Sequence, residues 1–217
     1  MMLPLQLAKT GEPLRVLCLG AHADDIEIGC AGTLLRWLGE HERVAVTWVV
    51  FSATDERAVE ARRSARALMR RAAELDIVLG DFPDARMLTE FDRAKDFVAA
   101  LARRTRPDVV LTHRLEDRHQ DHRLVAELTW QTWRDQLILE YEIPKYEGDL
   151  GQPNVYVPLP AAVAARKLKH LMAHFGSQRS KDWFRPATFQ GLMALRGVEC
   201  RAQSGHAEAF HLRKAVI

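Results

Sequence analysis

Apolar and polar positions alternate in blocks along the first 133 residues. Four short runs are almost continuously apolar, which is typical of strands buried on both faces. Between these runs, apolar residues recur every three or four positions, as in helices that bury one face. The predicted strands are residues 16–19, 44–51, 77–79 and 108–112; the predicted helices are residues 32–41, a helix capped at 54–56 that continues to 73, 89–104 with Thr89 as its cap and Phe91 facing inward, and 124–133.

The pattern changes after Trp133. Two short extended pieces, residues 137–142 and 154–157, are flanked by proline and glycine, and helices over 161–175 and 186–195 precede a last strand at 207–212. Continuous apolar strands that alternate with helices predict an α/β protein, with a mostly parallel sheet covered on both faces and a small C-terminal extension. The chain shows no repeat and no linker, so we expect residues 1–217 to form a single domain.

Clusters of polar and charged residues that could take part in catalysis or binding follow the predicted strands. They fall in residues 22–27, 52–57, 81–86 and 113–122, each directly after one of the first four strands. Ligands in parallel α/β sheets bind beyond the carboxyl ends of the strands, so these four segments are expected to meet at one edge.

The first of these segments crowds one imidazole and three carboxylates into six positions. His22, Asp24, Asp25 and Glu27 stand there, and like charges so close repel one another unless a positive group lies among them. Zinc binds both imidazole nitrogen and carboxylate oxygen. His22 and Asp25 are three residues apart across a turn and can reach one ion, which leaves Asp24 beside it.

The segment at 113–122 supplies three more histidines, together with Glu116, Asp117 and Asp121. His119 and His122 are three apart where a helix should begin, so they can share a face. A histidine from this segment would complete three protein ligands and leave the fourth position of zinc for water. A zinc-activated water, a carboxylate base and an imidazole serve the hydrolysis of an amide or an ester.

Composition and charge limit the classes of partner and the cellular location that we expect. The net charge is +2, from 31 basic and 29 acidic residues, which favours no nucleic-acid partner, and the arginines between 57 and 71 fit a solvated helix face. Three irregularly spaced cysteines fit a reduced, intracellular protein. No apolar run approaches the roughly 18 residues of a membrane span, and the N-terminus lacks a signal pattern. We therefore expect a soluble, cytoplasmic protein without a membrane partner; a homo-oligomer is compatible with the sequence.

The two histidine motifs together resemble a known family. A-H-A-D-D-I-E at residues 21–27, followed by G-C-A-G-T at 29–33, is similar to the signature of the PIG-L (LmbE-like) N-acetyl-sugar deacetylases, and H-Q-D-H at 119–122 is similar to their second motif. The resemblance implies a Rossmann-like fold and a hydrolase that uses one Zn²⁺ per chain to remove acetyl groups from amino sugars. Weaker matches lie at Arg57 and Glu60, Asp84, residues 174–178 and residues 207–210.

The resemblance also implies a role for each motif residue. His22, Asp25 and His122 would bind the zinc ion. Asp24 would be the general base and His119 the oxyanion stabiliser or acid, while Asp121 would orient a histidine. Ala23 and Gln120 depart from the family, which usually has proline at both positions; this bears on loop rigidity.

Four further residues are candidates for substrate contact. Glu27 is expected either to line the pocket or to cap the turn, and Arg57 either to bind the substrate or to pair with Glu60. Asp84 is a candidate for sugar hydroxyls, and His206 for reaching the pocket from the last strand.

Rival functions stay open at this point. A dinucleotide-binding domain would need a glycine-rich turn after the first strand, where this chain has carboxylates. A metal-dependent phosphoesterase and a non-catalytic metal-binding protein are the alternatives to the deacetylase. The sequence does not choose among a free amino sugar, a nucleotide sugar, a pseudo-disaccharide and a thiol glycoside as small-molecule substrate; residues 140–158 are expected to shape that specificity.

Overall fold

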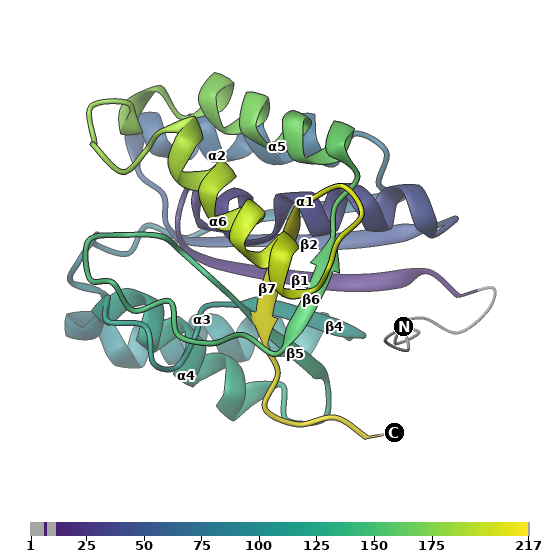
Figure 1. The fold of residues 1–217 in the computed structure, drawn as a ribbon. Coiled ribbons are helices and arrows are strands. Elements are labelled where there is room, and N and C mark those ends of the chain that lie inside the picture. Colours follow the sequence, from purple (N-terminus) through teal and green to yellow (C-terminus); the bar gives the residue numbers. More distant parts are fainter. Residues whose placement is uncertain (1–6, 8–11, 217) are drawn as a thin grey trace.

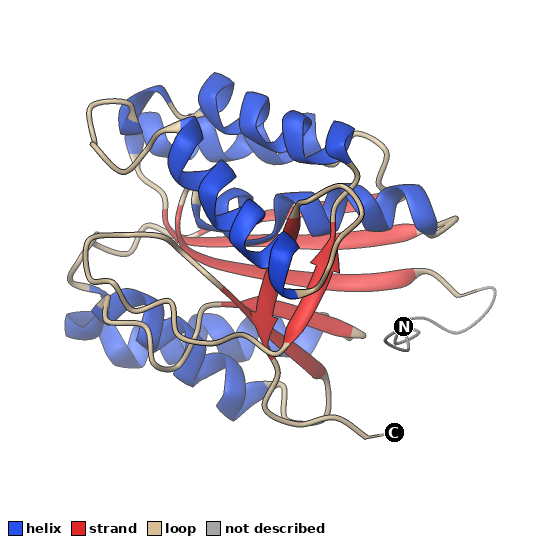
Figure 2. Cartoon of the chain, in the orientation of Figure 1, coloured by secondary structure: helices blue, strands red, loops and turns tan. Residues whose placement is uncertain are grey.

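The computed structural model describes Leu7 and residues 12–216, which form one seven-stranded sheet between two layers of helices (Figures 1 and 2). The strand order is β3-β2-β1-β4-β5-β7-β6. The strands are β1 (Leu14–His22), β2 (Val44–Ser52), β3 (Glu74–Leu79), β4 (Val109–Thr112), β5 (Leu137–Tyr141), β6 (Val155–Pro158) and β7 (Ala207–His211).

The first five strands are parallel and confirm the predicted α/β sheet. β1 pairs with β2 on one side and with β4 on the other, and β4 pairs with β5. β7 is antiparallel to both β5 and β6, so it inserts between two strands that precede it in the chain. The C-terminal segment therefore completes the same sheet.

Helices cover both faces of the sheet. α3 (Phe91–Arg104) and α4 (Gln120–Thr132) lie on one face, and α1 (Asp25–Glu40), α2 (Asp55–Leu68), α5 (Ala161–His174) and α6 (Pro186–Glu199) lie on the other (Figure 1). Alternate side chains of β1 enter two separate cores: Val16 and Cys18 face the α1 side, and Leu17 and Leu19 face the α3 side. Burial on both faces explains why the strands are continuously apolar.

Several predicted boundaries were wrong. The helix expected at residue 32 begins at Asp25. Its first turn contains Asp25 and Glu27, which were assigned to a polar turn, but acidic side chains are stable in a first helical turn because they interact favourably with the helix dipole. Likewise the helix expected at 124 begins at Gln120. The second helix ends at Leu68 rather than at 73, and β3 starts at Glu74 rather than at 77. β3 is an edge strand with exposed charges, which concealed its first residues from an apolar pattern.

The start of the third helix also differs from the prediction. Thr89 does not cap it, since Thr89 lies within a short 3₁₀ helix, η1 (Met87–Glu90), and its hydroxyl donates to Arg86 O. Phe91 is 39% exposed and does not face inward, because the helix begins at this residue and its first turn lies at the edge of the core.

Helix α1 is held against the sheet by close backbone approach and by a buried ion pair. Gly29 packs on the ring of Tyr141, whose hydroxyl donates to Leu19 O at 2.6 Å. Glu208 of β7 accepts hydrogen bonds from the backbone N–H groups of Gly32 and Thr33, and it pairs at 2.6 Å with Lys167 of α5. These contacts fix the helix whose first turn carries Asp25.

Within residues 12–216 and Leu7, no helix combines the length and apolarity needed to cross a bilayer. The expectation drawn from the extreme N-terminus, that it lacks a signal pattern, falls largely outside the described residues.

The short 3₁₀ helix η2 (Gly176–Gln178) lies between α5 and α6.

Candidate metal centre

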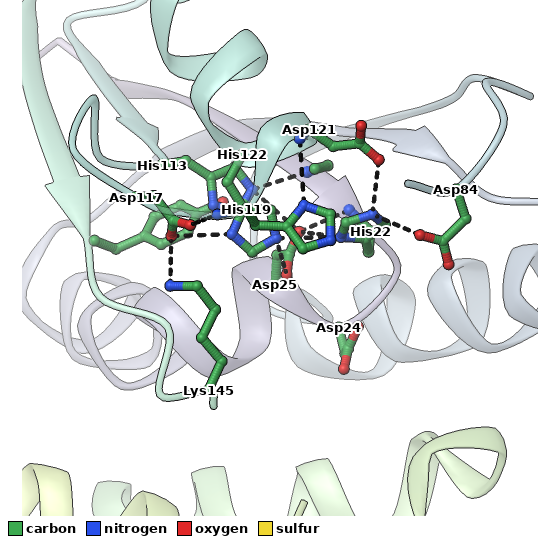
Figure 3. A network of polar contacts seen from close by, with 12 residues as sticks. His22, Asp24, Asp25, Asp84, His113, Asp117, His119, Asp121, His122 and Lys145 are labelled. Carbon is green, nitrogen blue, oxygen red and sulfur yellow. Dashed lines mark hydrogen bonds and ion pairs between the residues drawn. The ribbon is translucent and has the colours of Figure 1, made fainter. Parts of the chain in front are cut away.

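Segments that follow β1, β3 and β4 meet at the carboxyl edge of the sheet (Figure 3), and Arg57, from the segment after β2, contacts Asp24 and Asp84 there. His22 is the last residue of β1, and Asp25 opens α1 three residues later. His122, 100 residues away, lies in the first turn of α4, and its Nε2 atom is 3.2 Å from Nδ1 of His22. The sheet topology thus brings the two histidine motifs into contact.

Three donor atoms converge in this cluster. His22 Nδ1 lies 3.5 Å from Asp25 Oδ2, and His122 Nε2 lies 3.6 Å from Asp25 Oδ1. One ligand atom from each of the three residues lies within 4.8 Å of the others, and all three residues are buried. Two imidazole nitrogens and one carboxylate match the donor preferences of zinc.

The outer ring nitrogens of both histidines face carboxylates. His22 Nε2 lies 3.3 Å from Asp121 and 3.1 Å from Asp84, and His122 Nδ1 lies 3.0 Å from Asp117. A metal-binding histidine usually donates its second N–H in this way, which leaves the inner nitrogen free as a ligand. The donor set therefore fits a metal ion. Asp117 lies outside both histidine motifs and was assigned no role from the sequence; the one feature that could have indicated it is its acidic side chain five positions before His122.

Asp121 is fixed by the loop after β3. Its carboxylate accepts hydrogen bonds from the backbone N–H groups of Ala85, at 2.8 Å, and Met87, at 3.2 Å. Ala85 has a φ of 60°, a left-handed conformation that is uncommon for a residue with a Cβ and is often found at functional sites. Gln120 donates from its side chain to Ala85 O, which secures the same loop.

His119 caps α4 rather than lying within it. Its Nδ1 accepts the backbone N–H of Asp121 at 3.2 Å, so the neutral ring carries its proton on Nε2. The ring stacks on His122 with centroids 4.5 Å apart and contacts His22 edge-on at 4.9 Å. Burial lowers the pKa of His119, and the neighbouring His22 lowers it further, so near neutral pH this residue is a hydrogen-bond donor.

Asp24 takes a different direction from Asp25. Its Oδ1 lies 3.1 Å from Nη2 of Arg57, whose Nη1 binds Asp84 at 2.9 Å. Figure 3 draws no hydrogen bond or ion pair between the Asp24 side chain and the other side chains of the cluster. Burial raises the pKa of Asp24 and the adjacent Asp25 charge raises it further, whereas Arg57 opposes the shift. Arg57 does not pair with Glu60, because Glu60 accepts hydrogen bonds from the N–H and hydroxyl of Ser177.

Two candidate substrate contacts lie elsewhere. Glu27 is fully buried and accepts a hydrogen bond from Ser64 of α2, so it does not line an open pocket. It faces α2 because it lies two positions after Asp25 on a helix that is buried on most of its circumference. His206 hydrogen-bonds Ser204 in the turn before β7, and its described contacts do not include the histidine motifs.

Two other groups of donor atoms overlap this cluster. His22, Asp84 and His119 form one, and His113, Asp117 and His122 form the other. Asp84 is already paired with Arg57, and Asp117 with Lys145 at 3.0 Å. Among the described residues, the central set is free of such cations and is therefore the better candidate for a divalent ion.

The fold and the residues of this centre define an α/β protein with a buried His/Asp cluster that could hold a metal ion. A sequence model described as GlcNAc-PI de-N-acetylase, PIG-L, matches residues 17–133, over half of the chain. The chain belongs to the PIG-L family.

Solved structures share the fold at low sequence identity. N,N'-diacetylchitobiose deacetylase from Pyrococcus horikoshii is 20% identical, with 92% of this chain and 84% of that chain covered and a TM-score of 0.70. Conserved protein TT1542 from Thermus thermophilus is 22% identical, with coverage of 94% and 96% and a TM-score of 0.71. GalB, the 4-carboxy-2-hydroxymuconate hydratase from Pseudomonas putida, is 17% identical, with coverage of 94% and 97% and a TM-score of 0.69. The fold therefore carries more than one reaction.

Proposed function

We propose that this protein is a zinc-dependent N-deacetylase that hydrolyses the acetamide of an N-acetylated amino sugar or its conjugate. The observation that carries the proposal is the buried cluster of His22, Asp25 and His122, in which both histidines turn their outer nitrogens to carboxylates. Membership of the PIG-L family and the deacetylase among the structural relatives support it.

Asp24 and His119 have different roles in the proposed hydrolysis. Zinc, when bound, would polarise the acetyl carbonyl and lower the pKa of a water molecule towards neutrality. Asp24 takes the proton of the attacking water and passes it to the amine nitrogen as the C–N bond breaks, since its raised pKa suits a group that acts first as base and then as acid. His119 donates its Nε2–H to the oxygen that becomes negatively charged, because its Nδ1 is occupied by the Asp121 N–H.

We assign the binding of the sugar to Arg57 and Asp84. Asp84 is the exposed member of the centre, with 54% of its side chain accessible, and Arg57 links it to Asp24. A hydroxyl group that binds Arg57 and Asp84 would compete for the guanidinium and leave the Asp24 carboxylate free to turn towards the reacting water. This arrangement couples substrate binding to activation of the base.

Two measurements on purified protein test the proposal. Metal analysis should find about one zinc per chain, and zinc-loaded protein should release acetate from one or more members of a panel of N-acetylhexosamines, their nucleotide and lipid conjugates, and N,N'-diacetylchitobiose. Phosphate esters and 4-carboxy-2-hydroxymuconate serve as the comparison substrates. Turnover of either of these without acetate release would replace the deacetylase by a phosphoesterase or a hydratase. Zinc binding without any turnover would favour a non-catalytic metal-binding protein.

The adjacent aspartates give the sharpest test of the assignments. Asp24→Asn should keep zinc and lose about 10²–10⁴ in turnover, the usual contribution of a general base. Asp25→Asn should weaken zinc binding, since a neutral amide is a poor ligand. Zinc loss from Asp24→Asn with retention in Asp25→Asn would reverse the two roles.

A further inference from the structure

A buried lysine fastens the loop between β5 and β6 to Asp117, two residues before the second histidine motif. Lys145 Nζ lies 3.0 Å from Asp117 Oδ2 and 2.6 Å from Asp149 Oδ1. The side chains of all three residues are at most 9% exposed. An ion pair that is removed from solvent to this degree is weakly screened, so its geometry is held more firmly than that of a surface pair.

The same loop contacts residues 114–118, which precede the second histidine motif. Asp149 Oδ2 accepts the N–H of Arg118 at 2.6 Å, and Arg114 donates to the carbonyl oxygens of Asp149 and Leu150. Gly151 has a φ of 69°, and a Cβ at this position would lie 2.4 Å from the Arg114 guanidinium. The loop is therefore folded closely onto residues 114–118.

Asp117 is the junction between this loop and the metal centre. Its Oδ2 contacts both Lys145 Nζ and His122 Nδ1, each at 3.0 Å, and its Oδ1 accepts the N–H of His119 at 2.8 Å (Figure 3). A carboxylate held by three partners has little freedom, so a displacement of Lys145 is transmitted to the ring of His122. Lys145 lies 28 residues from Asp117, and the sequence motifs do not include it.

We propose that Lys145 is a positioning residue that couples the conformation of the loop at 142–154 to metal binding by His122, through Asp117. The inference rests on the zinc site of the proposed function. Coupling of this kind is reciprocal: zinc orders the loop, and displacement of the loop by a substrate or a mutation weakens zinc binding by the same factor. The loop that is expected to shape substrate specificity would then also change the affinity for the metal ion.

A double-mutant cycle separates coupling from a merely structural role. The zinc dissociation constant is measured by competition with a chelator, without substrate, for the unmodified protein, Lys145→Met, Asp117→Asn and the double variant. Lys169→Met, a change at an exposed lysine of α5, is the matched control. Loss of a group that orients a metal ligand typically costs about 10–100-fold in affinity, so we expect Lys145→Met to weaken zinc binding about tenfold. In the Asp117→Asn background the same change should have no further effect.

Hydrogen exchange of the loop provides a readout independent of affinity. Zinc should slow amide exchange in residues 143–152 of the unmodified protein and of Lys169→Met, and this protection should be lost in zinc-loaded Lys145→Met. The proposal is overturned if Lys145→Met binds zinc like the control, if its effect persists in the Asp117→Asn background, or if zinc protects the loop equally in the variant. A protein that binds no zinc would refute the proposed function itself, whereas zinc binding without this coupling refutes only the inference.

Discussion

Replacement of Gly29 by alanine tests whether packing behind α1 fixes the metal centre. Gly29 lies one helical turn after Asp25, against the fully buried ring of Tyr141. A Cβ at this position would lie 2.3, 2.5 and 2.9 Å from three atoms of Tyr141. The ring cannot turn away cheaply, because its hydroxyl donates to Leu19 O at 2.6 Å inside the core.

The magnitude follows from this geometry. Carbon atoms in contact prefer about 3.5–4.0 Å, so Gly29→Ala forces α1 or the ring to move by about 1 Å. Overpacking of this kind costs about 1–3 kcal/mol, and we expect the upper end because both ends of the Tyr141 side chain are held. Alanine recovers about 1 kcal/mol of helix propensity. The net loss is about 2 kcal/mol, which lowers Tm by about 4–8 °C in a chain of this size.

Gly39→Ala is the matched control in the same helix. A Cβ at Gly39 meets no atom within 4 Å, so this variant should gain up to about 1 kcal/mol. Urea and thermal unfolding of both variants, with zinc content and acetate release, provide the assay. A shift of about 1 Å at Asp25 should also reduce turnover by about 10²-fold. Equal stability of the two variants would refute the packing argument, and full activity of Gly29→Ala would refute its link to the centre.

Three further changes test other parts of the structure. His119→Ala should lower turnover by about 10²–10³ while zinc content is kept, because it removes one oxyanion donor; zinc loss would make His119 a ligand. Lys167→Met should destabilise the fold by about 3–5 kcal/mol, since it leaves Glu208 buried without its cation, and adding Glu208→Gln should restore part of the loss in urea unfolding. Burial lowers the pKa of His170 to about 3, with His174 and Arg166 contributing, so the folded protein keeps this ring neutral while the unfolded chain protonates it below about pH 6.5. Stability should therefore fall by up to about 2 kcal/mol between pH 7 and pH 5 through this group, and His170→Gln should remove that part of the pH dependence; an unchanged difference between the two pH values would contradict the shift.

The sequence by itself predicted the parallel core of the sheet and the edge at which the polar segments meet. Strands buried on both faces must be apolar throughout, so β1, β2 and β4 can be predicted from the sequence alone. His22 and Asp25 are also close for a local reason, since a short turn joins β1 to α1. Asp84, Asp121 and His119 lie beside His22 because parallel strands bring the segments that follow them to one edge, whereas Glu27 and His206 lie elsewhere.

Only the tertiary structure decided which side chains hold these residues in place. Arg57 links Asp24 to Asp84, and Lys145 contacts Asp117. These residues lie far apart in the sequence, so no rule based on residue spacing predicts the contacts. The pocket position expected for Glu27 was wrong because a carboxylate two residues from a candidate ligand can face either the site or the neighbouring helix, and the packing of α2 decides between them. Local periodicity records which face of an element is buried; the partner that a buried polar group finds depends on how distant elements pack, and that information is spread over the whole chain.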